Sequence, residues 1–248
     1  MRCKLPQHEV HLWYCFSDRL QDKQLLTSLE SELSPEERSE VARFVHVRDR
    51  RQRLITRGML RRLLSHYCEY SPQNWQFVRG KHGRPEIVRD PAMPPLRFNV
   101  THTTGLIAMV VGLKMDVGVD AETVHRRNNL AGIAERYFAD PEVQDLRDYQ
   151  VDSNHHAQWR RRFFEIWTLK EAYIKAVGKG LTLPLDQFWF QGFSVKGVQI
   201  EFQCPTPENP ANAWQFDQFY PSGDHIVATA VRAGGEQPLT VRVQGEFF

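Results

Sequence analysis

Three acidic residues and one lysine are the side chains of this sequence whose types and spacing best suit chemistry. Asp120 and Glu122 lie on one face of a predicted strand, because successive strand residues point to opposite faces. Gly118 lies on the same face and is expected to leave room for a ligand. Glu171 and Lys175 lie one turn apart on one face of a predicted helix. Three carboxylates and an ammonium suit a hard divalent cation, and we expect Mg²⁺, with Mn²⁺ as the alternative, bound together with substrate phosphates.

Each pair also has a plainer interpretation. The two strand acids alone are typical of a solvated edge strand, and the helical pair is typical of a surface salt bridge worth a few tenths of a kcal/mol. However, Phe164 and Trp167 lie on the same helical stripe as Glu171. A charged side chain on the same helix face as aromatic residues lies either where that face reaches solvent or partly buried beside a polar partner. The combination of strand acids and helix acid therefore favours a site.

Helices and strands alternate along the chain in an order that occurs twice. This order predicts an α+β protein of two similar α/β halves, residues 1–115 and 116–248, with a ligand site in the cleft between them. An N-cap serine followed by proline and glutamate predicts a helix start at residues 34–37. Further helices are predicted at 50–67, 130–138, 141–149 and 157–177. Strands are predicted at 10–16, 75–79, 97–101, 106–112, 116–122, 188–193, 198–202, 213–219 and 226–231.

Composition excludes several classes of protein. The formal net charge of +2 over 248 residues does not indicate a nucleic-acid-binding protein. No apolar run is long enough to span a membrane, and the N-terminus lacks the apolar core of a signal peptide. The four cysteines are scattered without a Cys-x-x-Cys pair, so neither a zinc site nor a disulfide framework is indicated. We expect a reduced, cytoplasmic location.

A basic helix is predicted at residues 50–62. Arg50, Arg53, Arg57 and Arg61 recur on it at three- and four-residue steps. The plainest interpretation is a solvated basic face. Phosphate capture by guanidinium forks and contact with a nucleic-acid backbone are the functional alternatives, and spacing alone does not separate them.

A glycine-rich basic turn and a strand that ends in a histidine are the remaining candidates. The turn, residues 79–85, is either a hairpin loop with incidental charge or an anion site made by backbone amides and Arg84. His102 lies between Thr101 and Thr103 at the end of a predicted strand. Such a histidine is more often structural than catalytic. Here it lies one hairpin away from Asp120, so it is a candidate to face the same pocket.

Four motifs together resemble a known family. Gly-Val-Asp-x-Glu, Trp-Thr-x-Lys-Glu-Ala-x-x-Lys, Gly-Arg-Pro and Phe-Asn-Val-Thr-His-Thr are similar to motifs of the 4′-phosphopantetheinyl transferases of the surfactin-synthetase-activating type. The resemblance covers residues 43–190, most of the chain. It implies a pseudo-twofold monomer of two α/β halves with coenzyme A bound between them.

The resemblance also implies roles for individual residues. Asp120, Glu122 and Glu171 match the metal ligands of the family. Lys175 matches its catalytic lysine, and His102 matches a pocket histidine that contacts a coenzyme phosphate, so we expect Glu171, Lys175 and His102 to be catalytic. The residues expected to contact coenzyme A are Arg43, Arg53, Arg79, Lys81, Arg84, Pro85, Asn99, Thr101, His102, Asp120 and Lys175.

The sequence departs from the family's pattern at three places. Arg84 replaces the usual lysine before a proline, and Thr101 and Thr103 replace serines. Glu37 and Glu40 lie in an early helix where some members carry lysines. The contact to the 3′-phosphate of the coenzyme is therefore expected from one of three arginines: Arg43, Arg53 or Arg57.

The activity that the resemblance implies is transfer of the 4′-phosphopantetheine group from coenzyme A to a serine of an apo acyl or peptidyl carrier protein. Adenosine 3′,5′-bisphosphate is the second product, and the carrier would serve fatty acid, polyketide or nonribosomal peptide synthesis. The enzyme is expected to act as a monomer, without nucleic acid or membrane. The alternative is a nucleic-acid-binding module that uses residues 50–62 and binds with steep salt dependence, without Mg²⁺ or coenzyme A. A non-catalytic carrier-protein binder is a third possibility, which the intact set of acids disfavours.

Overall fold

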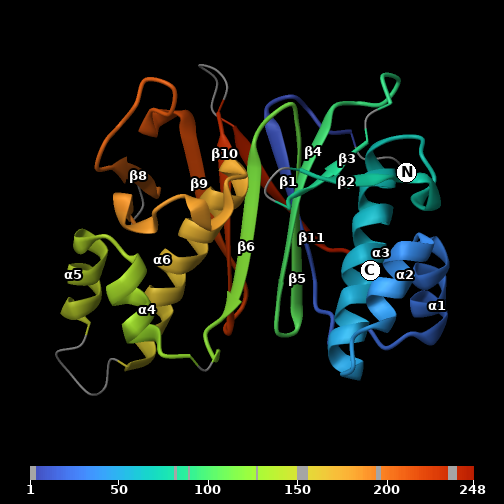
Figure 1. Ribbon diagram of the computed structural model, residues 1–248, viewed down its shortest axis with the longest axis horizontal. Coiled ribbons are helices and arrows are strands. Elements are labelled where there is room, and N and C mark those ends of the chain that lie inside the picture. The colour runs from blue at the N-terminus through green and yellow to red at the C-terminus, as the bar shows by residue number, and fades with distance from the viewer. Residues whose placement is uncertain are drawn as a thin grey trace. The chain divides into compact units, whose positions relative to one another are not determined.

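The chain folds into two compact units (Figure 1). The computed structural model describes residues 4–80, 83–88, 90–126, 128–149, 156–193, 197–233 and 239–248. The first unit comprises Met1–Lys114 and Thr240–Phe248, and the second comprises Met115–Leu239. The predicted division into 1–115 and 116–248 therefore needs one correction. The last strand belongs to the first unit, because β11 (Thr240–Glu246) pairs in parallel with β1 (Glu9–Cys15).

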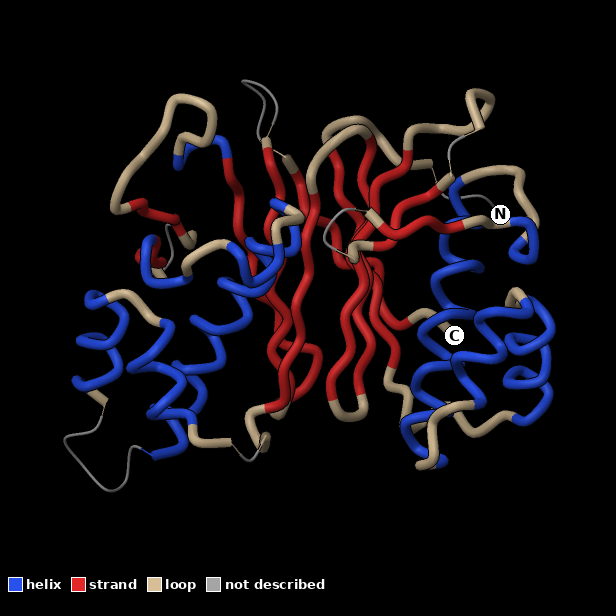
Figure 2. Tube along the Cα trace, viewed as in Figure 1, coloured by secondary structure: helices blue, strands red, loops and turns tan. Residues whose placement is uncertain are grey.

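In its described part, the first unit has a four-stranded sheet, three helices and a short hairpin. The strand order is β11-β1-β5-β4, with antiparallel pairs β1–β5 and β4–β5. The helices lie on one side of this sheet (Figure 2). The other elements are α1 (Lys23–Glu32), α2 (Pro35–Ala42), α3 (Val47–Tyr67), β2 (Phe77–Arg79), β3 (Pro85–Ile87), β4 (Leu96–Thr103) and β5 (Leu106–Leu113).

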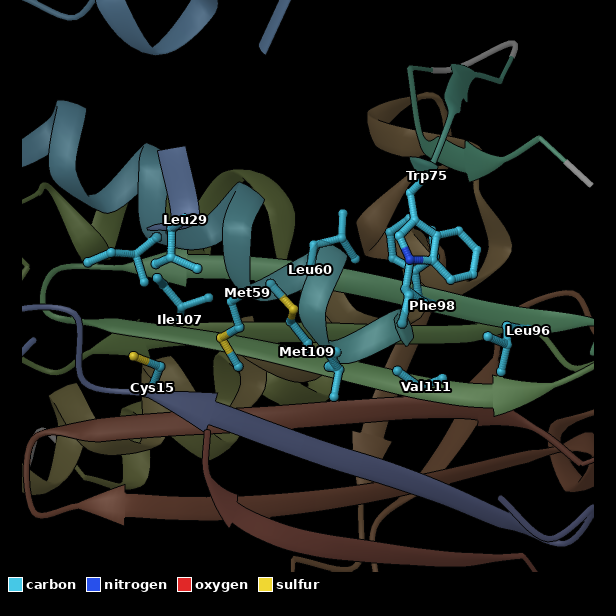
Figure 3. Packing of buried hydrophobic residues seen from close by; sticks show 13 residues of the cluster. Cys15, Leu29, Met59, Leu60, Trp75, Leu96, Phe98, Ile107, Met109 and Val111 are labelled. Atoms are coloured by element: carbon cyan, nitrogen blue, oxygen red, sulfur yellow. The ribbon is translucent and has the colours of Figure 1, made fainter. Parts of the chain in front are cut away.

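The hydrophobic core of the first unit forms between α3 and the sheet. Met59 and Leu60 of α3 face Ile107 and Met109 of β5, and Leu29 of α1 packs beside them (Figure 3). All five side chains are buried. Burying apolar surface is the main favourable contribution to folding, so this contact holds α3 against the sheet.

A capping box starts α2 at the predicted place. The Ser34 hydroxyl accepts a hydrogen bond from the amide of Glu37, and the Glu37 carboxylate accepts one from the amide of Ser34. This reciprocal pair satisfies two amide groups that the helix itself leaves without partners. The same Glu37 carboxylate lies 2.7 Å from the buried guanidinium of Arg61. The cap therefore also fixes α2 against α3.

In its described part, the second unit has a three-stranded sheet, three helices and a two-stranded hairpin. The strand order is β6-β10-β9, and both pairs are antiparallel. Helix α6 packs along β6 and β10. The elements are β6 (Val117–Thr123), α4 (Leu130–Tyr137), α5 (Asp140–Asp148), α6 (His156–Val177), β7 (Phe188–Gln191), β8 (Gln199–Phe202), β9 (Trp214–Ser222) and β10 (His225–Arg232).

The two units share one order of elements. In the described residues, each has a strand, then three helices, a short hairpin and a long antiparallel hairpin, and the first unit adds β11 from the end of the chain. In both sheets the first strand pairs with the last strand of that hairpin, as β1-β5-β4 and β6-β10-β9. The α+β class and the repeated order of elements are confirmed. The pseudo-twofold relation and the cleft remain predictions.

Gly118 provides space for helix α6 and not for a ligand, so that part of the sequence interpretation is wrong. A Cβ atom on Gly118 would lie 2.0 Å from the carbonyl oxygen of Ala172 and 2.6 Å from the amide nitrogen of Ala176. The missing side chain lets the backbone of β6 approach that of α6. Because Asp120 and Glu122 follow on the same strand face, they are directed toward this helix.

Gly118→Ala should destabilise the protein by about 3 kcal/mol, because the new methyl group meets backbone atoms that cannot move aside alone. Gly223→Ala is the matched control, since a Cβ atom there has no neighbour within 4 Å. Urea unfolding of both variants measures the difference. Equal stability of the two variants would contradict the close packing of β6 on α6.

The described helices include none that combines the length and the apolar character needed to cross a membrane.

Candidate active site

The second unit brings the predicted acids and lysine together between β6 and α6. The ammonium of Lys175 donates a hydrogen bond to Asp120 Oδ1 at 2.5 Å and another to the carbonyl oxygen of Val119 at 3.4 Å. Glu122 forms an ion pair with Arg126, which follows the strand. The carboxylates of Asp120 and Glu122 are both almost fully buried. Buried carboxylates need nearby cations, which Lys175 and Arg126 supply here.

Glu171 completes this cluster and differs from the other two acids. Burial, together with the neighbouring charge of Asp120 and against the opposing effect of Lys175, raises the pKa of its carboxyl group to about 7. A desolvated carboxylate beside a like charge holds its proton more strongly. Glu171 is therefore about half protonated near neutral pH.

The acids are not arranged as a closed metal site. Within the described part of the chain, no three His, Cys, Asp or Glu side chains lie close enough together to hold a metal ion as they stand. Asp120 faces Lys175 and Glu122 faces Arg126. Their chemistry nevertheless fits a hard cation, because all three predicted ligands are carboxylates. Arg126 was not among the predicted site residues. Its position four residues after Glu122 was the signal in the sequence that could have indicated an ion pair.

The first unit contains a pocket of about 1000 Å³ beside α2, α3 and the β2–β3 hairpin. Four of the expected coenzyme-contacting residues line it: Arg53, Arg79, Pro85 and His102. The lining also includes Arg57 and Arg61 from α3 and Glu36, Glu37 and Glu40 from α2. A basic pocket with acidic groups in its wall suits a ligand that carries negative charge.

The other expected coenzyme contacts are not among the lining residues. Arg43 is exposed at the C-terminal end of α2. Arg84 donates a hydrogen bond to the carbonyl oxygen of Phe98 at 3.2 Å. Asn99 and Thr101 are buried in β4. Lys81 lies outside the described residues.

Comparisons with known proteins identify the family. A sequence model described as 4′-phosphopantetheinyl transferase superfamily matches residues 116–230, and one described as 4′-phosphopantetheinyl transferase, N-terminal, matches residues 21–113. The 4′-phosphopantetheinyl transferase HetI of Nostoc sp. is 31% identical over 239 residues, which cover 94% of this chain and 92% of HetI. The chain belongs to the 4′-phosphopantetheinyl transferase superfamily. It is also 29% identical to the 4′-phosphopantetheinyl transferase Sfp of Bacillus subtilis over 185 residues, 72% of this chain and 74% of Sfp. The human L-aminoadipate-semialdehyde dehydrogenase-phosphopantetheinyl transferase is 24% identical over 213 residues, 81% of this chain and 67% of that protein.

The protein is thus an enzyme of the phosphopantetheinyl transferase class, and its family motif contains a residue that sequence reasoning missed. In Trp-Thr-x-Lys-Glu-Ala, the residue before Glu171 is Lys170, whose side chain is completely buried. Its ammonium lies 2.7 Å from a carboxylate oxygen of Glu142 and donates to the carbonyl oxygens of Leu185 and Phe188, each also at 2.7 Å. Lys170 therefore holds the transferase fold together, while the next residue belongs to the acid cluster.

Proposed function

We propose that this transferase moves the 4′-phosphopantetheine group from coenzyme A to a serine of an apo acyl or peptidyl carrier protein. Adenosine 3′,5′-bisphosphate is released. Membership of the transferase family supports the proposal. The observation that carries it is the cluster of the buried acids Asp120 and Glu122 with the half-buried Glu171 and Lys175. The arginine-lined pocket of the first unit supplies cationic groups for coenzyme phosphates.

The nucleic-acid alternative loses its main support, because much of the basic helix is engaged inside the protein. Arg53 and Arg57 pair with Glu40, and Arg61 pairs with Glu37. These guanidiniums therefore do not form the open basic face that a phosphate backbone requires. The comparisons contain nothing in favour of nucleic-acid binding.

We propose Asp120, Glu122 and Glu171 as the residues that would hold Mg²⁺. Lys175 and Arg126 balance part of their charge, which agrees with acids that need a cation. When bound, the metal would supply charge neutralisation at the coenzyme diphosphate.

The side chains of the chain itself perform the remaining steps in this proposal. Glu171 accepts the proton of the carrier serine, whose oxygen forms a bond to the phosphorus that bears pantetheine. The bond from that phosphorus to the bridging oxygen breaks, and adenosine 3′,5′-bisphosphate leaves with the electron pair. Lys175 stabilises the charge that develops on the leaving phosphate, and His102 helps to hold the coenzyme.

Metal affinity should depend on pH, because a proton on Glu171 competes with the metal. The folded-state pKa of about 7 lies above the ordinary value of 4.5, so lowering the pH through 7 adds a proton that metal binding must release. We expect Mg²⁺ to bind about tenfold more weakly at pH 6 than at pH 8. Titration calorimetry at both pH values, in buffers with different ionisation enthalpies, measures the affinity and the released proton. Affinity independent of pH over this range would contradict the prediction.

Intact-mass analysis of an apo acyl carrier protein tests the function directly. The carrier is incubated with the enzyme, coenzyme A and Mg²⁺, and a parallel sample contains EDTA. A mass gain equal to one phosphopantetheine group, lost with EDTA, is the expected result. Absence of the gain on acyl and peptidyl carriers alike, together with absence of coenzyme A binding, would overturn the proposal.

The proposal includes action as a monomer in the cytoplasm.

A further inference from the structure

One carboxylate lies among three of the arginines at the pocket of the first unit. Glu40 of α2 accepts hydrogen bonds from Arg53 at 3.1 Å and Arg57 at 3.3 Å, both on α3, and from Arg79 of β2 at 3.3 Å. These guanidiniums are the only side-chain partners of the Glu40 carboxylate in the part of the chain that the structure describes. Glu40 thus occupies the position that an anionic ligand of the arginines would take.

The arginines have hydrogen-bonding capacity that Glu40 does not use. The Nε–H groups of Arg53 and Arg57 are buried without a hydrogen-bond partner among the described residues. The Arg57 side chain is only 15% exposed, and burial lowers its pKa. Buried guanidinium donors are usually satisfied, and phosphate oxygens are strong acceptors for them. A phosphate would therefore satisfy this group of donors better than one carboxylate does.

Glu40 can leave the arginines more easily than the neighbouring Glu37. The Glu37 side chain is 11% exposed, and its carboxylate caps its own helix and pairs with Arg61. The Glu40 side chain is 34% exposed and lies near the C-terminal end of α2. Among the described residues, a change of its side-chain rotamer would break only the three arginine contacts, and it would turn the carboxylate toward solvent.

We propose that Glu40 is a resident counter-anion of this pocket, which the 3′-phosphate of coenzyme A displaces from Arg53, Arg57 and Arg79. The inference rests on the proposed function and adds a residue that sets specificity. A phosphate monoester carries close to two negative charges and three acceptor oxygens, which match three guanidiniums better than the single charge of a carboxylate. Because one anion replaces another, Glu40 lowers the affinity for coenzyme A. It also weakens the selection of coenzyme A over 3′-dephospho-coenzyme A.

Binding of these two ligands to the full-length chain tests the proposal without any catalytic step. Titration calorimetry compares the wild type with Glu40→Gln and with Glu36→Gln. Glu36 is the matched control, because it lines the same pocket but its carboxylate accepts from the Ser34 hydroxyl and not from an arginine. Glu40→Gln should bind coenzyme A about tenfold more tightly, with little change for 3′-dephospho-coenzyme A. Glu36→Gln should change both affinities by less than about twofold, as expected for a screened charge.

Without the charge of Glu40 the three arginines repel one another, and Glu40→Gln could then fail to fold. A second variant tests the proposal in that case. Arg79 is 71% exposed, so Arg79→Gln should remain folded. It should weaken coenzyme A binding several-fold and leave 3′-dephospho-coenzyme A nearly unchanged.

The possible outcomes separate this inference from the proposed function. If the wild type binds coenzyme A but Glu40→Gln does not tighten it, or tightens both ligands equally, the counter-anion role is wrong while the function stands. An unchanged ratio of affinities in Arg79→Gln would also overturn the role. If the wild type binds neither ligand, the inference and the proposed function both fail.

Discussion

Replacing Glu171 by glutamine should lower the rate of phosphopantetheine transfer about a thousandfold while the protein stays folded. Glutamine keeps the size of the side chain but removes both the proton acceptor and one of the proposed metal-ligating carboxylates. Loss of a general base alone costs between about a hundredfold and ten-thousandfold in rate. Glu171 lies in the cluster with Asp120 and Lys175, so the substitution acts at the proposed base and at the proposed metal site together.

The same substitution should stabilise the metal-free protein at high pH. The pKa of Glu171 is raised from 4.5 to about 7 in the folded protein, so the folded state binds its proton more strongly than the unfolded state does. Stability is therefore lost as the pH rises from 4.5 through 7, by an amount on the order of 3 kcal/mol. Glutamine does not ionise, so Glu171→Gln should melt above the wild type in EDTA at pH 8 and close to it at pH 5.

Two measurements check these expectations. Intact-mass analysis follows transfer to an apo carrier, and thermal melting in EDTA at both pH values follows stability. Glu135→Gln is the control, because Glu135 is an exposed residue of α4 in the same unit. Full activity of Glu171→Gln would exclude both the base role and the metal role. A melting temperature equal to that of the wild type at pH 8 would contradict the raised pKa.

Replacing Lys170 by methionine should destabilise the protein by about 4 kcal/mol, the largest loss of stability that we expect from a single change. Its partner Glu142 is also buried, and burial raises the pKa of Glu142 and lowers that of Lys170. Each charge is tolerated there because the other is present. Removing one partner of a buried ion pair leaves an uncompensated charge in the interior, which costs about 3–5 kcal/mol.

A double-mutant cycle distinguishes this effect from lost packing. Glu142→Gln removes the charge of Glu142 and keeps one oxygen, which can accept from only one of the two amides, of Ala139 and Phe190, that the two carboxylate oxygens accept from. The double variant should be clearly more stable than the sum of the two single changes predicts. Lys179→Met, at an exposed lysine just after α6, is the control and should change stability little. Urea unfolding measures all four variants. A Lys170→Met variant as stable as Lys179→Met would show that no buried charge depends on this lysine.

Features set by near neighbours in the chain were predictable from the sequence. The alternation around Asp120 and Glu122 requires only the period of a strand, and the spacing of Glu171 and Lys175 requires only the period of a helix. The start of α2 was equally predictable, because all the groups of its capping box lie within four residues. The motifs that identify the family have the same local character.

Features that depend on partners far along the chain were not predictable. Strand β11 joins the first unit because it pairs with β1 at the other end of the sequence. The α1 helix and the β3 strand were also missed, since α1 begins only with an Asp22 cap and β3 has three residues. Gly118 lies on the same strand face as two acids, which suggested space for a ligand. The space is filled by the backbone of α6, which is remote in the sequence.

The sequence by itself determined the family, the α+β class and the four residues of the acid cluster, because local periodicity and short motifs carry that information. Only the tertiary structure decided which charges lie inside and what faces them. It buries Lys170 against Glu142 and places Glu40 among arginines from two other elements. The physical reason is that the energy of a charge depends on its burial and on partners brought close by folding, and neither is encoded by spacing along the chain.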